Sequence, residues 1–142
     1  MIEAAAARDL PDVHVLLERL HLPLAGIDEH LPTLLVARDD GRIVGTAALE
    51  LYADGALLRS VAVEPRHQGQ QLGHQLTDAA LRLATAHRMP TVFLLTTTAE
   101  RFFPKFGFEP ITRDQVPSSV RASVEFQSAC PASAIVMRKQ LT

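Results

Sequence analysis

The chain lacks the features of a disulfide-bonded, membrane-spanning or secreted protein. One cysteine, Cys130, cannot form an internal disulfide, and this usage is typical of a reducing cytosol. Uninterrupted apolar runs stay far below the roughly 18 residues that a membrane-spanning helix needs. The first residues include the acids Glu3 and Asp9 and lack the apolar core of a secretion signal. We therefore expect a single cytoplasmic domain over residues 1–142, with no membrane partner.

Neither sign of charge is in large excess. The formal net charge is −2, and the basic residues are scattered, with the densest group at Arg138 and Lys139. Nucleic-acid binding needs clustered lysine and arginine, so no nucleic-acid partner is expected. The six histidines are not spaced with cysteines or carboxylates in the manner of metal ligands, so no metal is expected either.

Turn signals and apolar patterning predict an antiparallel meander in the first half of the chain. Residues 39–42, Asp-Asp-Gly-Arg, are a strong hairpin signal, and Asp54 with Gly55 marks a second turn. Asp9 is a good N-cap for a helix that reaches Leu20. Beyond that helix, the expected elements are a short helix over residues 27–31 and strands over residues 2–5, 33–38, 43–51 and 56–63.

The second half alternates helices with strands. An apolar stripe that includes Leu72, Leu76 and Ala84 predicts an amphipathic helix that opens at Gly73. The continuous apolar run inside Thr91–Thr96 is typical of a strand buried on both faces. Strand, helix and strand in succession imply a right-handed crossover, so this strand should lie parallel to residues 56–63.

A short aromatic helix and a last strand are expected after this crossover. Thr97 and Glu100 predict a capping box for a helix that Gly107 ends, and Pro104 should kink or shorten it. Residues 133–138 are expected to close the sheet. The fold class is therefore mixed α/β (α+β).

The segment between the predicted strand and helix is the most informative part of the sequence. The strand pattern breaks at Pro65, a polar loop with two glycines follows, and the helix opens at Gly73. Free backbone N–H groups and the positive end of a helix dipole meet there, which favours phosphate. The loop lacks the spacing of dinucleotide-binding folds and the Gly-Lys-Ser/Thr of a P-loop. Taken alone, two glycines before a helix also suit a simple tight turn.

This segment resembles the cofactor loop of the GCN5-related N-acetyltransferases (GNAT). Their motif Gln/Arg-x-x-Gly-x-Gly/Ala lies on residues 68–73, and their Gly-Phe pair after an aromatic helix lies on Gly107 and Phe108. Residues 94–103 are similar to the acetyltransferase domain of N-acetylglutamate synthases. Residues 121–134 add a closer similarity to the small acetyltransferases associated with arsenic-resistance operons.

The resemblance implies a fold, a co-substrate and a reaction. The fold is a mainly antiparallel sheet with helices on both faces, and its central parallel strand pair splays around the acetyl-CoA slot. The reaction moves an acetyl group from acetyl-CoA to the amine of a small molecule, an amino acid or an amino-acid-like toxicant. Cofactor binding falls on Val61, Ala62, Val63, Gln68, Gly69, Gln70, Gln71, Leu72, Gly73, His74 and Phe103.

Other functions remain open beside this one. An acyl-CoA-binding or sensing module with little or no turnover is the main alternative, and an enzyme that acetylates proteins is a third. The resemblance also implies that a homodimer forms through the last strands.

Two departures from the family pattern affect the site. Gln71 stands where the family usually has a glycine, so it must take an ordinary conformation or accept strain. Phe103 stands where many relatives have a tyrosine that protonates the departing thiolate, and the only tyrosine, Tyr52, does not match that position. A thiolate leaves readily because its pKa is about 8.5, so Thr97, Thr98 or water could donate instead.

The remaining catalytic and substrate roles are assigned from residue chemistry. A backbone N–H of residues 61–63 can stabilise the oxyanion that forms when an amine attacks the thioester. Glu50 is the first candidate for the base, with an outward-facing strand carboxylate as the alternative. For Arg59 two roles are open, a bidentate clamp on a substrate carboxylate and an exposed strand position. Thr96, at the end of the next strand, is assigned to the substrate.

Overall fold

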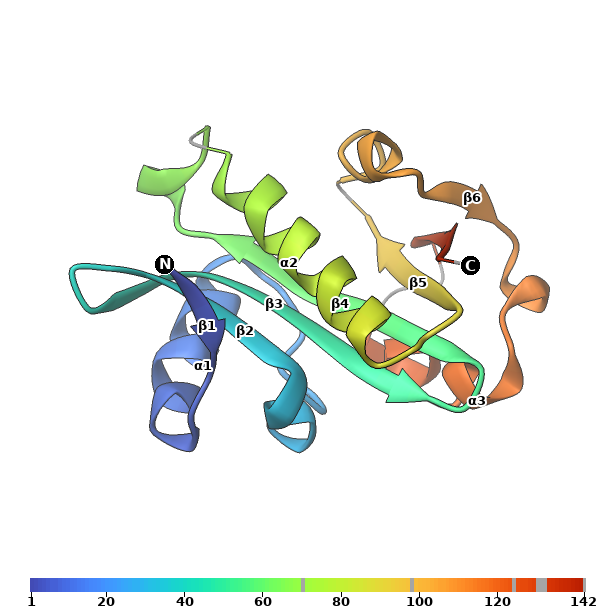
Figure 1. Cartoon of the computed structure of the whole chain (residues 1–142), viewed down its shortest axis with the longest axis horizontal. Helices are drawn as coiled ribbons and strands as arrows, with labels where there is room; N and C mark the ends of the chain where they lie inside the picture. The colour runs from blue at the N-terminus through green and yellow to red at the C-terminus, as the bar shows by residue number, and fades with distance from the viewer. Residues whose placement is uncertain (70, 98, 124, 130–132, 142) are drawn as a thin grey trace.

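The computed structural model describes residues 1–69, 71–97, 99–123, 125–129 and 133–141. Its centre is a seven-stranded sheet in the order β1-β2-β3-β4-β5-β7-β6 (Figure 1). The strands are β1 (Ile2–Ala4), β2 (Leu34–Asp39), β3 (Arg42–Tyr52), β4 (Gly55–Val63), β5 (Thr91–Thr96), β6 (Glu109–Ile111) and β7 (Ile135–Gln140). The α-helices are α1 (Leu10–Arg19), α2 (Leu72–Ala86) and α3 (Ser118–Arg121). Short helical turns are η1 (Ala7–Asp9), η2 (Asp28–Thr33), η3 (Pro65–His67), η4 (Phe103–Phe106) and η5 (Arg113–Gln115), with a π-helical segment η6 (Glu125–Ala129).

The sheet confirms the predicted fold class. Strands β1 to β4 form an antiparallel meander, and β4 pairs with β5 in parallel. Between β2 and β3, Asp40 and Gly41 both have positive φ, 51° and 77°. A two-residue hairpin turn needs this conformation to match the twist of its strands, and Asp and Gly tolerate it.

Several details differ from the sequence-based expectation. β7 does not end the sheet but lies between β5 and β6, and the edge strand β6 was not expected. The aromatic turn is a 3₁₀ helix that begins at Phe103, and no capping box joins Thr97 to Glu100 among the described contacts. Instead, the Ala99 N–H donates to Thr96 Oγ1 at 2.9 Å. Pro104 lies in the first turn, where its missing N–H costs nothing.

Asp9 precedes α1, as expected, but its side chain does not cap that helix. Its Oδ2 accepts from the Ala6 N–H and from Arg38 Nη2, each at 2.8 Å. The Ala6 N–H and then the Arg38 guanidinium lower the pKa of this carboxyl. Asp9 therefore links the start of α1 to β2.

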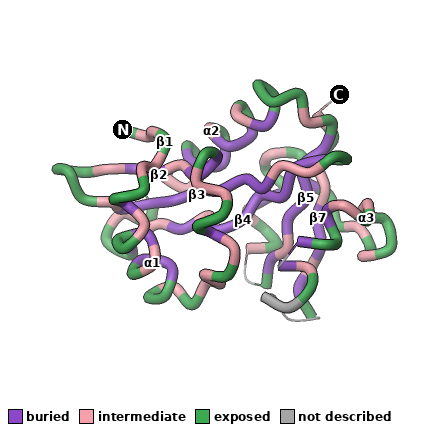
Figure 2. Tube along the Cα trace, turned by 90° about the horizontal axis from the view of Figure 1, so that it is seen from below, coloured by how far each residue is buried: buried purple, intermediate pink, exposed green. Residues whose placement is uncertain are grey.

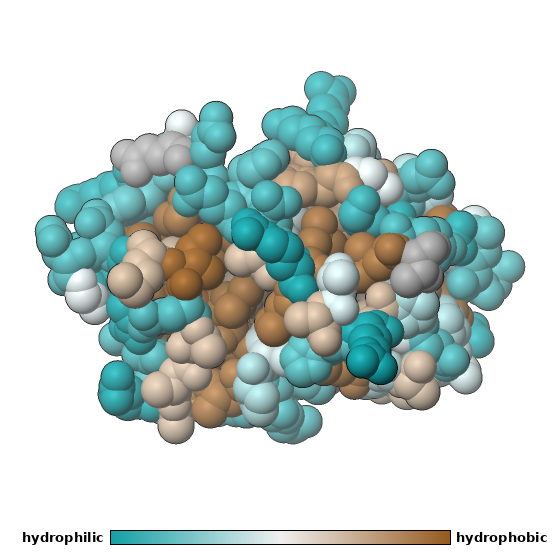
Figure 3. All heavy atoms as spheres, in the orientation of Figure 1, coloured by the Kyte–Doolittle hydropathy of each residue, from teal (hydrophilic) through white to brown (hydrophobic). Residues whose placement is uncertain are grey.

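Helices cover both faces of the sheet. On one face, Leu76, Ala80 and Ala84 of α2 pack on the central strands. On the other, α1 packs on one half of the sheet, and α3 with η6 packs on Leu57 and Phe93 in the other half. Figure 2 shows the buried stretches concentrated in the central strands, and Figure 3 shows apolar side chains gathered in the middle of the α2 face. Within the described residues, no helix is both long and apolar enough to cross a membrane.

Close packing of α2 on β3 predicts a stability effect at Gly45. A Cβ atom there would lie 2.7 Å from Leu76 Cδ1 and 3.2 Å from the Ala62 carbonyl oxygen. We expect Gly45→Ala to lower the free energy of unfolding by about 1–3 kcal/mol, as overpacked cores do. Urea unfolding measures the change. Adding Leu76→Val, which removes the clashing methyl group, should recover part of the loss, and a fully stable single variant would contradict this packing.

Candidate active site

The site begins at a bulge in β4. Thr46 and Ala48 of β3 pair with Ala62 and Arg59, so β4 has one extra residue between these pairs. Ser60 lies in the bulge, and its φ of 58° is in the left-handed region. Thr46 Oγ1 donates to the Ser60 carbonyl oxygen at 2.7 Å. Bulges of this kind bend a strand and interrupt its pairing.

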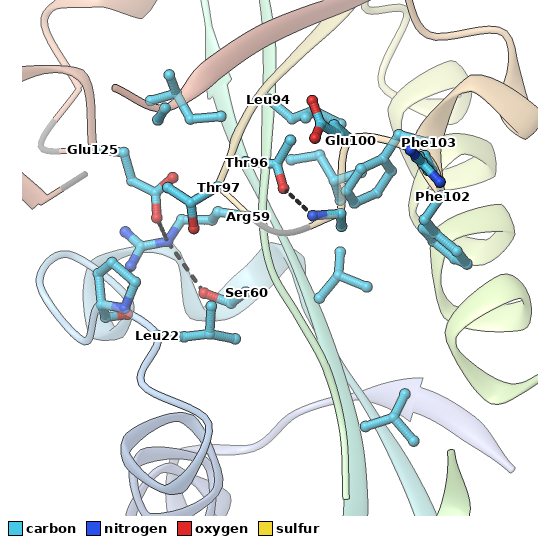
Figure 4. A pocket seen from close by; sticks show the side chains of 18 of the residues that line it. Leu22, Arg59, Ser60, Leu94, Thr96, Thr97, Glu100, Phe102, Phe103 and Glu125 are labelled. Atoms are coloured by element: carbon cyan, nitrogen blue, oxygen red, sulfur yellow. Dashed lines mark hydrogen bonds and ion pairs between the residues drawn. The ribbon is translucent and has the colours of Figure 1, made fainter. Parts of the chain in front are cut away.

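The bent strand leaves β5 and opens a cleft. The two parallel strands pair only at Ala56 with Val92 and at Leu57 with Phe93. Beyond these pairs lies a cavity of about 1140 Å³, and Figure 4 shows side chains of β4, β5 and the aromatic turn pointing into it. The cavity is large enough for a cofactor arm and a small second substrate.

The loop between β4 and α2, here called the glycine loop, forms a second hollow at the mouth of this cleft. The hollow has a volume of about 450 Å³ and shares Val63, Gln68, Phe102 and Lys105 with the larger cavity. Gln68 Nε2 donates to the Val63 carbonyl oxygen at 3.0 Å, which ties the loop to the end of β4. The helix α2 starts directly behind the loop, at Leu72.

Most of the predicted cofactor residues line these two hollows. Those on the larger cavity are Val61, Val63, Gln68 and Phe103, and those on the smaller one are Val63, Gln68, Gly69, Gln71, Leu72, Gly73 and His74. Ala62 instead packs its side chain in the cluster around α1, on the opposite face. The predictions for Gln70, Thr98 and Cys130 lie outside the described residues.

The backbone of Gln71 has a strained conformation. Its φ of 62° and ψ of 14° place it in the left-handed region, immediately before α2. This was one of the two conformations left open by the sequence, and a side chain there costs about 1–2 kcal/mol.

The inner wall of the cleft holds a buried ion-pair network around Arg59. Its Nη1 donates to Glu50 Oε2 at 2.9 Å and to the Ala25 carbonyl oxygen at 2.6 Å. Its Nη2 donates to the Pro23 carbonyl oxygen at 3.0 Å, and its Nε to Ser60 Oγ at 3.2 Å. All three nitrogens therefore have protein acceptors, and the side chain is 0% exposed. This geometry does not support the predicted bidentate clamp on a substrate carboxylate.

Glu50 lies behind Arg59. Its side chain is only 1% exposed, and it accepts hydrogen bonds from Arg59 and from the Tyr52 hydroxyl. His30 Nε2 lies 3.6 Å from the same carboxylate. Burial, and then the Glu50 carboxylate, raise the pKa of Tyr52 far above its ordinary value, so this hydroxyl stays protonated. Glu50 is neither outward-facing nor among the residues that line the cleft, so its position does not support the predicted role as base.

Glu125 is a site residue that the sequence analysis missed. It belongs to η6, is 4% exposed and lines the cavity, and its Oε2 lies 3.3 Å from Arg59 Nε. Nothing in the pattern of residues 121–134 marks a helix that would bring this carboxylate to β4. Only a contact between segments far apart in the chain creates the pair.

Thr96, Thr97 and Phe103 line the cleft opposite β4. The Thr96 hydroxyl accepts from the Ala99 N–H, while Thr97 is exposed at the end of β5. Phe103 is 6% exposed and packs edge-on against Phe102 and Phe108, with ring centroids 5.1 Å and 5.8 Å away. Because a phenyl ring has no hydroxyl, it supplies no proton here. The described residues contain no group of three or more side chains arranged to hold a metal ion.

Comparison with known proteins identifies the class. Residues 30–110 match the family described as acetyltransferase (GNAT) domain. This match spans more than half of the chain, so the protein belongs to the GNAT acetyltransferases, as the motif resemblance predicted.

Its relatives include amino-acid acetyltransferases. The protein of that name from Mycobacterium tuberculosis is 37% identical over 81 residues, which are 56% of this chain and 46% of that protein. The one from Pseudomonas syringae pv. tomato is 30% identical over 103 residues, 71% of this chain and 24% of that protein. The chain thus spans less than half the length of either relative.

Solved structures share the fold. N-acetylglutamate synthase from Neisseria gonorrhoeae, complexed with coenzyme A and N-acetyl-glutamate, superposes with a TM-score of 0.86 at 22% identity. The match covers 100% of this chain and 35% of that one. Rv2747 from Mycobacterium tuberculosis, in a complex that contains CoA, gives a TM-score of 0.85 at 24% identity and covers 100% and 99% of the two chains.

The strain at Gln71 predicts that Gln71→Gly stabilises the protein. Glycine has no penalty in the left-handed region, but it also raises the conformational entropy of the unfolded chain. We therefore expect the free energy of unfolding to increase by a net of about 0.5–1 kcal/mol. Thermal unfolding measures it. Gly69→Ala is the matched control, because Gly69 has φ 86° and open space around it, and it should lose about 1 kcal/mol. A destabilised Gln71→Gly variant would show that the glutamine side chain contributes more than its backbone costs.

The network predicts a large stability loss for Glu50→Ala. This change leaves the buried Arg59 guanidinium without one carboxylate, and breaking a buried pair costs about 3–5 kcal/mol. The control is Glu3→Ala, which breaks the 2.8 Å pair with Arg38, where Glu3 is 41% exposed. That loss should stay below about 1 kcal/mol. Denaturant unfolding of both variants tests the difference, and equal losses would contradict a buried network.

Proposed function

We propose that this protein is an acetyl-CoA-dependent N-acetyltransferase that acts on the amine of a small molecule, an amino acid or an amino-acid-like toxicant. The observation that carries the proposal is the cleft between β4 and β5, which continues into the glycine loop before α2. The names of the relatives, amino-acid acetyltransferase and N-acetylglutamate synthase, support the acceptor class.

Acetyl-CoA fits the shape and chemistry of the two hollows. Loop N–H groups and the start of α2 suit the pyrophosphate. The pantetheine arm would follow β4 along Val61 and Val63, where the strand edge has left β5. Phe103, which lines the inner cavity, would pack against this arm near the thioester.

In the reaction, the neutral amine attacks the thioester carbonyl carbon, a carbon–nitrogen bond forms and the carbon–sulfur bond breaks. A backbone N–H of residues 61–63 would stabilise the oxyanion. The thiolate is protonated by Thr97 or by water, because Phe103 has replaced the usual acid. Thr96 lies on the same wall and would contact the acceptor.

The enzyme is favoured over the sensing module because the relatives with a stated activity are acetyltransferases. The cytoplasmic location, the homodimer and the link to arsenic resistance remain predictions from the sequence.

The proposal predicts that free CoA is released only when a suitable amine is present. We expect a panel of amino acids and simple amines, incubated with acetyl-CoA, to contain acceptors that raise thiol release well above the rate without amine. The thiol is followed with a chromogenic reagent. Gly73→Asp is the control. Gly73 lines the smaller hollow, so a carboxylate there should repel the pyrophosphate and abolish both acetyl-CoA binding and turnover. If calorimetry shows CoA binding while no amine is acetylated, the sensing module is the better description.

A further inference from the structure

Two carboxylates share the single guanidinium of Arg59, and they occupy different environments. Glu50 reaches Arg59 from β3 and lies behind it, sealed from the cavity. Glu125 reaches it from η6 on the cavity side, with 3.3 Å between Oε2 and Nε. The same arginine therefore orients one carboxylate in the interior and one at the cleft.

The carboxylate of Glu125 faces the cavity beside the bulge of β4. Figure 4 shows Glu125, Thr97 and Arg59 pointing into the same region, next to Ser60 at the bulge. In the proposed reaction the acetyl group lies where β4 leaves β5, just past this bulge. An amine that attacks there must approach through the region that Glu125 faces.

We propose that Glu125 is a catalytic residue, the group that receives the acceptor's amine and takes its proton. This inference rests on the proposed function. Arg59 is a positioning residue. Its contacts with Glu50 and with the Pro23 and Ala25 carbonyl oxygens fix the guanidinium in place, and its positive charge, 3.3 Å from Glu125 Oε2, positions that carboxylate.

The proton balance is simple. The acceptor enters as an ammonium ion that pairs with the ionised carboxylate, and it attacks after giving one proton to water. When the carbon–nitrogen bond forms, the nitrogen becomes strongly acidic and its remaining excess proton passes to Glu125. The thiolate leaves as the carbon–sulfur bond breaks, and the carboxylic acid returns its proton to solvent.

Charged groups from several elements bear on Glu125. Arg59 from β4 and Glu50 from β3 are described above, and His21, Glu100, Arg101 and Lys105 line the same cavity. Arg113 of η5 lies over the ring of the neighbouring Phe126, with 5.8 Å to the centroid. A pH profile alone would contain the titrations of several of these groups, so the experiment varies the acceptor instead.

The experiment compares Glu125→Gln with the wild-type protein on two kinds of acceptor. One is the best amino acid of the panel, whose amine is an ammonium ion at neutral pH, and the other is hydroxylamine, whose nitrogen is mostly uncharged there. For the amino acid we expect kcat/KM to fall by about 100-fold or more, the usual contribution of a general base. With hydroxylamine the fall should be smaller, because its nitrogen still gives up a proton when the carbon–nitrogen bond forms but no ammonium has to be held. Glu109→Gln, the same change on the exposed strand β6, should leave both rates unchanged.

Calorimetry with CoA separates a catalytic effect from a structural one. We expect Glu125→Gln to bind CoA like the wild type, and Glu125→Asp, which keeps the charge, to regain part of the activity. Wild-type rates in Glu125→Gln would overturn the proposal and leave the proposed function intact. Equal losses on both acceptors together with weakened CoA binding would also overturn it. A wild-type protein that binds CoA and acetylates nothing would instead remove the proposed function, and this inference with it.

Discussion

The site depends on one backbone constraint, the left-handed conformation of Ser60. A regular β4 would continue its parallel pairing with β5 beyond Leu57, and the two strands would close over the space that is now the cleft. The extra residue at the bulge turns β4 away instead. A serine in this region costs about 1–2 kcal/mol relative to a regular strand. The hydrogen bond from Thr46 to the Ser60 carbonyl oxygen offsets part of that cost and keeps the buried carbonyl satisfied.

The Arg59 network makes the bulge rigid from the other side. Its guanidinium contacts Ser60 Oγ, two carbonyl oxygens of the loop after α1, and carboxylates from β3 and η6. Burying a cation is costly unless each donor finds an acceptor, and here every guanidinium nitrogen does. Segments that are distant in the sequence thus meet at one point on the wall of the cleft. A buried charge contributes less to stability than to placing these segments, because alternative arrangements would leave it unpaired.

The sequence predicts the parts of this protein that local chemistry determines. The hairpin at Asp40 and Gly41, the stripe of α2 and the apolar run of β5 all follow from turn residues and periodicity, and so does the parallel pairing of β4 and β5. The loop before α2 could be found because Gly69 and Gly73 stand where the strand pattern gives way to the helix pattern. By contrast, β6 has three residues, one of them proline, and no detectable period. The pairing of Glu125 with Arg59, like the burial of Glu50, depends on contacts between distant segments that no local pattern encodes.

Backbone strain is distributed unevenly among the described residues. Five that are not glycine have positive φ, and Asp40 and Arg88 of these lie at ordinary turns between elements, as does His21 after α1. Of the other two, Ser60 immediately precedes the segment that the proposed function assigns to the cofactor, and Gln71 lies near the end of that segment. Strained backbone persists where the surrounding structure holds it in place, and it concentrates at functional sites. Ser60 opens the cleft, and Gln71 turns the chain into α2 so that the loop faces the same opening. Regular conformations at these two positions would relieve the backbone strain, but they would also remove the geometry that joins the smaller hollow to the cleft.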